Sequence, residues 1–208
     1  MMLKRFARSQ DGATMVEMAI AMTLLLLLTL GFVDLGNALY QWNSANKAVQ
    51  VGARLAAISN PVATGLAAAA PTATPGAPVE AGAYGPFDCT STASASCPGF
   101  IAANFSRIFR GDTLATDNDA CPAPTGSQRP GMCHFYPLLK RENVVVRYAA
   151  TGLGYQTRQA GPVPTITVSL RNVKFQFFFL NGLLGFREID MPPMLSTVTG
   201  EDMKSTAP

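Results

Sequence analysis

The sequence predicts an α+β protein in which one long N-terminal helix is followed by a small antiparallel β-sheet. An apolar segment, residues 13–33, contains no proline and continues into a stretch with helical spacing. After residue 143, short segments rich in β-branched residues follow one another without helices between them, and such strands pair antiparallel. We therefore expect four parts: a basic leader (1–12), a helix (13–59), an Ala/Pro/Thr-rich linker (60–85) and a cysteine-containing β-rich domain (86–208).

Composition limits the classes of function. The net charge is +3 and no basic stripe is interleaved with aromatic residues, which argues against nucleic acid as a partner. Only 14% of the residues are charged, below the usual quarter. Small and weakly polar residues replace the charges, a composition that favours an exported protein over a cytosolic enzyme.

The apolar segment has the length of a membrane span. Its 21 residues form a helix of about 30 Å, the hydrocarbon thickness of a bilayer. Lys4, Arg5 and Arg8 precede it, so the positive-inside rule places the N-terminus in the cytoplasm and the rest of the chain outside. A secretory signal peptide is the alternative, but the apolar run is long for one and no clean A-x-A cleavage site follows.

The helical spacing continues beyond the apolar segment as a single stripe. The stripe consists of Leu35, Leu39, Trp42, Ala45, Val49, Gly52 and Ala56. Small residues recur every fourth position at 48, 52 and 56, which lets another element approach closely. We expect this face to pack against the protein's own domain, with a contact to another subunit as the alternative.

Glu17 lies inside the apolar segment. An acid in a membrane span is costly and indicates a functional role by default. The alternative is that Glu17 lies near the cytoplasmic interface and extends its carboxylate into water.

These N-terminal residues carry a resemblance. A short Lys/Arg leader ends at Gly12, and Glu17 stands five residues later, as in the processing region of type IV prepilins. The first 60 residues more narrowly resemble the TadE/TadG-like family, pseudopilin-like proteins of the tight-adherence (Flp) pilus system. The positions that match are Gly12, Ala13, Glu17, the leucine run, Gly31, Asp34, Gly36, Leu39, Tyr40 and Gly52-Ala53-Arg54. Met18 departs from the pattern, because Flp-type pilins usually carry an aromatic residue there.

The resemblance implies a site, partners and a location. A prepilin peptidase would cut between Gly12 and Ala13, and Glu17 would neutralise the N-terminal amine of a neighbouring pilin-like subunit. The partners would be the membrane, other pilin-like subunits and proteins of the Tad machinery. The protein would sit in the bacterial inner membrane as a single-pass protein with its C-terminal domain in the periplasm or outside the cell. The expected fold is pilin-like, with the long helix laid across the small sheet.

The four cysteines, Cys89, Cys97, Cys121 and Cys133, are expected to form disulfides. An even number in an exported domain favours them, and four cysteines allow three connectivities. Pairing of nearest neighbours would close two short loops rich in Pro and Gly. We expect no metal site, because no C-x-x-C is present and His134 adjoins Cys133 instead of standing at ligand spacing.

The remaining segments give local predictions. Residues 60–85 lack the composition for a core and predict a loosely ordered loop, with a possible helical turn at LAAAA. Residues 98–109 predict a short helix. Residues 143–151, 164–170 and 173–177 predict strands, with a bulge or bend at Arg171-Asn172, and residues 187–199 predict a further one. Asp112, Asp117 and Asp119 predict a solvated loop, since the EF-hand spacing is absent.

The segment Phe175–Phe186 (FQFFFLNGLLGF) is unusually apolar but too short to span a bilayer. It predicts either packing onto the domain core or a loop that rests on the membrane surface or contacts a partner subunit.

No catalytic motif is evident. The G-x-S-x-G elbow, the P-loop and H-E-x-x-H are all absent, and His134 is the one histidine. We expect no enzyme activity and no cofactor. The sequence favours a minor pilin or pseudopilin of a Flp-type pilus. The alternatives are an unprocessed membrane scaffold of the same machinery and an anchored exported enzyme or binding module.

Overall fold

The computed structural model describes residues 11–69, 74–113, 118–156, 161–184, 189–201 and 203. The chain divides into two compact units. One unit combines the N-terminal part of the chain up to Tyr40 with residues 175–189, and the other contains residues 41–174 and 190–208.

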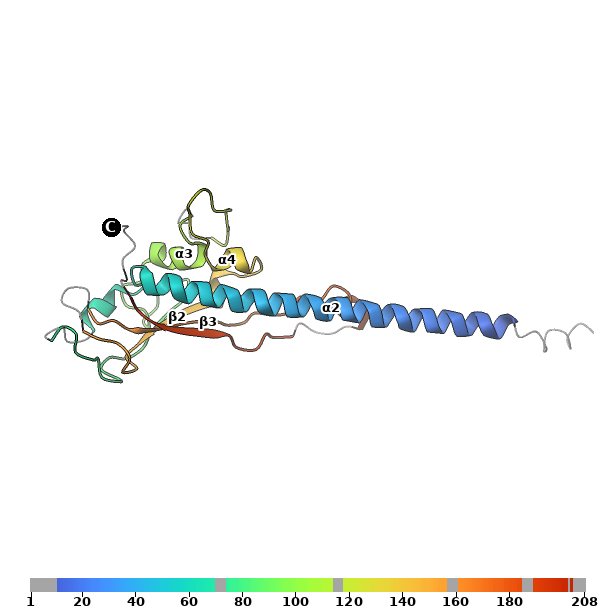
Figure 1. The fold of residues 1–208 in the computed structure, drawn as a ribbon, viewed down its shortest axis with the longest axis horizontal. Coiled ribbons are helices and arrows are strands. Elements are labelled where there is room, and N and C mark those ends of the chain that lie inside the picture. The colour runs from blue at the N-terminus through green and yellow to red at the C-terminus, as the bar shows by residue number, and fades with distance from the viewer. Residues whose placement is uncertain are drawn as a thin grey trace, which may run out of the picture. The chain divides into compact units, whose positions relative to one another are not determined.

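The predicted long helix is present. Helix α2, Asp11–Ile58, is 48 residues long and is the dominant element in Figure 1. It contains no proline. The helix ends shortly before Asn60-Pro61, because the residue before a proline is disfavoured in helical conformation. The described part of the chain contains one helix that is long and apolar enough to cross a membrane, and none of its most apolar window is buried.

The unit around the N-terminal part of α2 also contains a short helix, α5, Leu180–Leu184. The predicted strand over residues 173–177 is wrong. The backbone makes only an isolated bridge at Lys174, which pairs with Asp190. Asn172 has a φ of 54°, in the left-handed region, so the chain turns where the sequence parity changes and the ladder ends there.

The second unit contains a four-stranded antiparallel sheet in the order β1-β2-β3-β4. The strands are β1 (Phe87–Cys89), β2 (Val144–Ala149), β3 (Thr165–Leu170) and β4 (Leu195–Thr199). Val146 pairs with Val168, and Thr167 pairs with Thr197. The predicted strands in residues 143–151 and 164–170 are confirmed, β4 begins after Pro192-Pro193, and β1 was not predicted. The predicted α+β fold class is confirmed.

The core of this unit follows the alternation of the strands. Val144, Val146 and Tyr148 of β2 are fully buried, as are Ile166 and Val168 of β3. Each buried aliphatic side chain contributes roughly 1.5–3 kcal/mol relative to an exposed one. The buried face of the sheet is therefore the one that the period-two pattern predicts.

Only the later part of the helical stripe is buried. Ala45, Val49 and Ala56 are almost completely inaccessible, whereas Leu35 and Leu39 are 56% and 66% exposed. The expectation that the whole stripe packs on the protein's own domain is thus wrong for its first two residues. They precede Gln41, where α2 enters the second unit.

Two short helices, α3 (Ala102–Arg110) and α4 (Met132–Phe135), belong to the same unit. The predicted helix over residues 98–109 begins four residues later than expected, because Gly99 has a φ of 69° and the Ile101 N–H is bonded to the Val62 carbonyl. A Cβ on Gly52 would lie 2.5 Å from Met132 Sδ, so the small residue allows α2 and α4 to approach. This confirms the predicted close approach at position 52.

The prediction of a loosely ordered, coreless linker is wrong for the part that the structure describes. Val62, Ala63, Leu66 and Val79 are all buried, and a 3-10 helix covers Thr64–Ala68. The Val62 N–H donates to the Tyr148 hydroxyl at 3.0 Å, which attaches the segment to β2. A few apolar residues suffice here because they fill space that the sheet and helices already enclose.

Candidate functional site

The start of α2 holds the three residues that the sequence singles out. Gly12, Ala13 and Glu17 lie in its first two turns, and all three are exposed. A Cβ on Gly12 would meet no atom within 4 Å. The Gly12–Ala13 bond lies in the first turn, where the backbone N–H groups lack helical partners and unwinding costs least. Residues 1–10 of the leader lie outside the described residues.

The apolar part of α2 carries two threonines, and both satisfy their hydroxyls internally. Thr23 Oγ1 donates to the Ala19 carbonyl at 2.7 Å, and Thr29 Oγ1 donates to the Leu26 carbonyl at 2.9 Å. Leu24, Leu26 and Leu28 nearby are more than half exposed. A helix with this surface suits lipid, where a polar group without a partner is costly.

Asp34 follows the apolar segment directly and is completely buried. Its carboxylate accepts hydrogen bonds from the backbone N–H groups of Phe178 (2.9 Å), Phe179 (2.9 Å) and Leu180 (2.7 Å). One turn further along α2, Asn37 Nδ2 donates to the Gln176 carbonyl at 2.9 Å. We call these contacts the Asp34 clasp. It fixes the apolar segment 175–180 against the helix.

Asp34 had no predicted role beyond its place in the family pattern. The signal was nevertheless present, because a carboxylate directly after an apolar segment needs hydrogen-bond donors. Its partners are backbone groups about 145 residues away, so no side-chain motif marks them.

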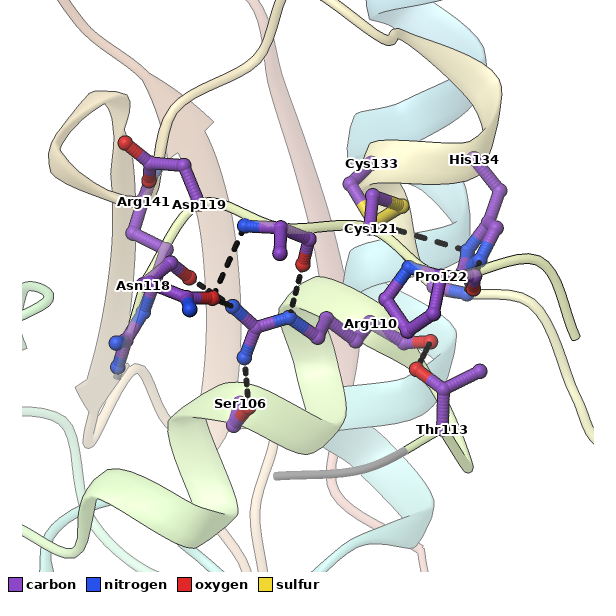
Figure 2. Close-up of a disulfide and its surroundings, with 12 residues drawn as sticks. Ser106, Arg110, Thr113, Asn118, Asp119, Cys121, Pro122, Cys133, His134 and Arg141 are labelled. Atoms are coloured by element: carbon purple, nitrogen blue, oxygen red, sulfur yellow. Dashed lines mark hydrogen bonds between the residues drawn. A yellow bond between two sulfur atoms is a disulfide. The ribbon is translucent and has the colours of Figure 1, made fainter. Parts of the chain in front are cut away.

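The four cysteines form two disulfides, as predicted, and nearest neighbours are paired. Cys89 joins Cys97 with their Cα atoms 5.0 Å apart, and Cys121 joins Cys133 with their Cα atoms 6.0 Å apart. Figure 2 shows the second disulfide beside His134. Sulfur and imidazole atoms of Cys121, Cys133 and His134 lie within 4.8 Å of one another, but the two sulfurs are bonded to each other, which removes the thiolates that a metal would need.

Hydrogen bonds hold His134 in place. Its Nδ1 lies 3.0 Å from the Gly131 N–H, and its Nε2 lies 2.9 Å from the Pro122 carbonyl. The imidazole thus joins the residue after Cys121 to the beginning of α4 (Figure 2). Because both ring nitrogens have partners, the arrangement fastens two loops and does not present a catalytic base.

Arg110 is completely buried beside the same disulfide. Its guanidinium donates to Ser106 Oγ at 2.7 Å and to Asn118 Oδ1 at 2.9 Å. It also donates to the carbonyls of Asn118 and Ala120 (Figure 2). The cation therefore organises the segment that leads into Cys121 by donating to oxygens of Asn118 and Ala120.

The aspartates of the predicted solvated loop have protein partners where the structure describes them. Asp112 forms ion pairs with Arg107 at 3.0 Å and with Arg129 at 2.8 Å. The Arg129 guanidinium, with help from Arg107, holds the pKa of the Asp112 carboxyl well below its usual range. Asp119 accepts a hydrogen bond from the Arg141 N–H at 2.8 Å. Asp117 lies outside the described residues.

The fold and the exposed apolar helix fit the class of single-pass membrane proteins that carry an α+β domain. Residues 12–54 match the model of a family described as TadE-like protein, which confirms the resemblance seen in this segment. The match covers Gly12, Glu17, Asp34 and Gly52. No curated protein and no solved structure matches the chain. The TadE-like family is structural, not enzymatic, and belongs to the Tad/Flp pilus system.

Proposed function

We propose that this protein is a minor pilin or pseudopilin that takes part in assembling or anchoring a Flp-type pilus. The observation that carries the proposal is the match of residues 12–54 to the TadE-like family. The most apolar part of this helix is not buried by the rest of the described protein. An apolar helix without its own cover needs lipid or the helices of other subunits around it.

Glu17 is the proposed docking residue. It lies exposed in the second turn of α2, surrounded by exposed apolar side chains such as Val16 and Ile20. If the leader is cut after Gly12, Ala13 becomes a positively charged N-terminus. Pairing that amine with Glu17 of a neighbouring subunit would remove much of the cost of either charge in lipid.

The remaining parts of the proposal concern processing and place. A prepilin peptidase cuts the leader, the N-terminus of the precursor faces the cytoplasm, and the domain with the two disulfides lies on the oxidising side of the inner membrane. The domain boundaries at residues 12, 59 and 85 belong to the same proposal. The protein itself carries out no catalysis.

Mass spectrometry of the N-terminal peptide tests processing. We expect Ala13 as the first residue in membrane and sheared-pilus fractions of the native host. A peptide that begins at Met1 in both fractions would instead support an unprocessed membrane scaffold.

A pair of variants tests docking. Glu17→Ala should abolish or strongly reduce assembled pili while the protein remains in the membrane. Met18→Ala, at the next exposed position, is the matched control and should leave pili near the wild-type level. Normal piliation of Glu17→Ala would remove the proposed role of the carboxylate.

A further inference from the structure

The clasped segment presents aromatic side chains to the outside. Phe178 is 69% exposed and Phe179 is 38% exposed, although the backbone of both residues is bonded to Asp34. Folded proteins seldom fix an aromatic pair outward without a partner for it. The hydrogen-bonded backbone and the exposed rings together indicate a surface that contacts an apolar environment.

The position of the clasp along α2 specifies that environment. Asp34 is the first residue after the apolar segment 13–33, so it lies at the boundary of the hydrocarbon layer when that segment spans a bilayer. Asn37 is three residues further, about 4.5 Å along the axis. The headgroup region is roughly 5–7 Å thick on each side. Both contacts of the clasp therefore fall within the interfacial layer.

The direction of the segment supports the same placement. Gln176 is bonded beside Asn37, and Phe178 to Leu180 are bonded beside Asp34. The chain thus runs toward the apolar part of α2 as it proceeds from 176 to 180. Phe32 and Val33, in the last turn before the clasp, are also more than half exposed, so this turn of α2 and the clasped segment, which belong to the same unit, both present apolar side chains to the outside.

The hydrogen bonding suits a site with little water. A carboxylate at this depth is costly without donors, and backbone N–H groups of an irregular segment are costly without acceptors. The clasp satisfies both, because the Asp34 carboxylate takes three of those N–H groups at once.

The charge pattern also favours lipid. Residues 175–186 contain no charged side chain, and Lys174 precedes them while Arg187 and Glu188 follow them in the sequence. An uncharged aromatic segment with charged residues at both ends matches a membrane interface, where rings enter below the headgroups and charged groups stay in water.

We propose that the clasped segment is a membrane-interface anchor: Phe178 and Phe179 insert into the outer headgroup boundary of the same bilayer that α2 crosses. This inference requires that α2 spans a bilayer, but it does not depend on pilus assembly or on the docking role of Glu17.

Site-directed spin labelling tests the anchor directly. All four cysteines are in disulfides, so a single introduced cysteine can be labelled selectively in the full-length protein. We would label Phe178→Cys in nanodiscs that contain zwitterionic and anionic phospholipids. Power saturation then compares collision with oxygen, which concentrates in lipid, and with a water-soluble nickel chelate.

Two matched positions calibrate the measurement. Leu26→Cys, in the apolar part of α2, gives the lipid reference, and Leu153→Cys, 70% exposed in the sheet-containing unit, gives the water reference. We expect the label at 178 to collide with oxygen at least about threefold more, relative to nickel, than the label at 153. A ratio equal to that at 153 would overturn the proposal.

Low collision with both reagents would also overturn it, because the segment would then be buried against protein. Asp34→Ala provides a second measurement. Loss of the clasp should move the oxygen-to-nickel ratio at 178 toward the water reference, while the ratio at 26 stays unchanged. No change at 178 would show that Asp34 does not position the anchor.

Discussion

The Asp34 carboxylate accepts a hydrogen bond from the Leu180 N–H at 2.7 Å, across 146 positions of sequence. This contact joins the end of the apolar helix segment to the beginning of α5. A single acidic side chain thereby substitutes for the missing acceptors of three successive backbone donors, as a helix N-cap does. Asp34 thereby attaches residues 178–180 to α2 through three hydrogen bonds.

Replacement of Asp34 should loosen that segment locally. In Asp34→Ala, three backbone N–H groups lose their charged acceptor, so amide exchange in peptides covering residues 175–184 should accelerate by roughly tenfold or more. Asp34→Asn keeps one oxygen acceptor, so its rate of amide exchange should lie between those of Asp34→Ala and the wild type. Hydrogen exchange on the full-length protein in nanodiscs measures the effect. Leu35→Ala, at an exposed neighbouring position, is the control, and its amide exchange in residues 175–184 should equal that of the wild type. Wild-type exchange rates in Asp34→Ala would show that the clasp does not hold the segment.

Gly52→Ala should destabilise the contact between α2 and α4. The new Cβ would lie 2.5 Å from Sδ of the fully buried Met132, so we expect a cost of about 1–3 kcal/mol from overpacking. Gly36→Ala is the control, because a Cβ there meets nothing within 4 Å and alanine favours helix by about 0.5–1 kcal/mol. Thermal unfolding in detergent measures both. The double variant Gly52→Ala, Met132→Ala should lose less than the sum of the single changes, and strict additivity would contradict the contact.

The ion pairs of Asp112 should make the domain sensitive to acid. Its carboxyl has a pKa below the ordinary value of 3.8 because Arg129 and Arg107 bind the charged form. The resulting stabilisation is complete above about pH 4 and is lost as the pH falls toward the lowered pKa of the folded state. Because the pairs are partly exposed, we expect roughly 1 kcal/mol.

Asp112→Asn isolates this contribution. The wild type should be more stable than the variant at pH 6, and the difference should shrink as the pH falls below 4. Unfolding midpoints of the full-length protein across this range provide the measurement. A difference that grows on acidification would show that the carboxyl is not stabilised as an anion.

Loss of the Cys121–Cys133 disulfide should affect the buried cluster around Arg110. The bridge closes a loop with a sequence separation of 12, for which the chain-entropy model gives about 3 kcal/mol. In the Cys121→Ser, Cys133→Ser variant we expect that loss, together with faster exchange in residues 118–134. The Cys89→Ser, Cys97→Ser variant removes the other bridge and should leave exchange in residues 118–134 unchanged. Equal exchange effects of both variants would contradict the local role.

Much of the fold could be predicted because its signals are local. The length and hydropathy of residues 13–33 predict the apolar helix, and the alternation in residues 164–170 predicts β3 with its buried Ile166 and Val168. The helical spacing carries α2 on to Ile58. The even number of cysteines predicts disulfides, although three connectivities fit it equally well.

Local pattern misled where tertiary contacts override it. Residues 173–177 alternate like a strand, but Asn172 turns the chain before a ladder can continue. Residues 60–85 have the composition of a loose linker, yet Val62 and Leu66 are buried because other elements enclose them. The buried Arg110 carries no sequence mark either, since backbone carbonyls and the Asn118 side-chain amide are among the groups that accept its hydrogen bonds.

Local sequence pattern is enough to predict a long apolar helix near the N-terminus, the prepilin-like spacing of Gly12 and Glu17, and a β-rich domain with four cysteines after the helix. These properties depend on hydropathy, period and residue type within one segment. Long-range contacts, which the pattern does not reveal, determine which cysteines pair, which part of the helical stripe is buried and which backbone groups Asp34 binds. The physical reason is that these contacts join residues far apart in sequence, and their partners include backbone groups that every residue possesses.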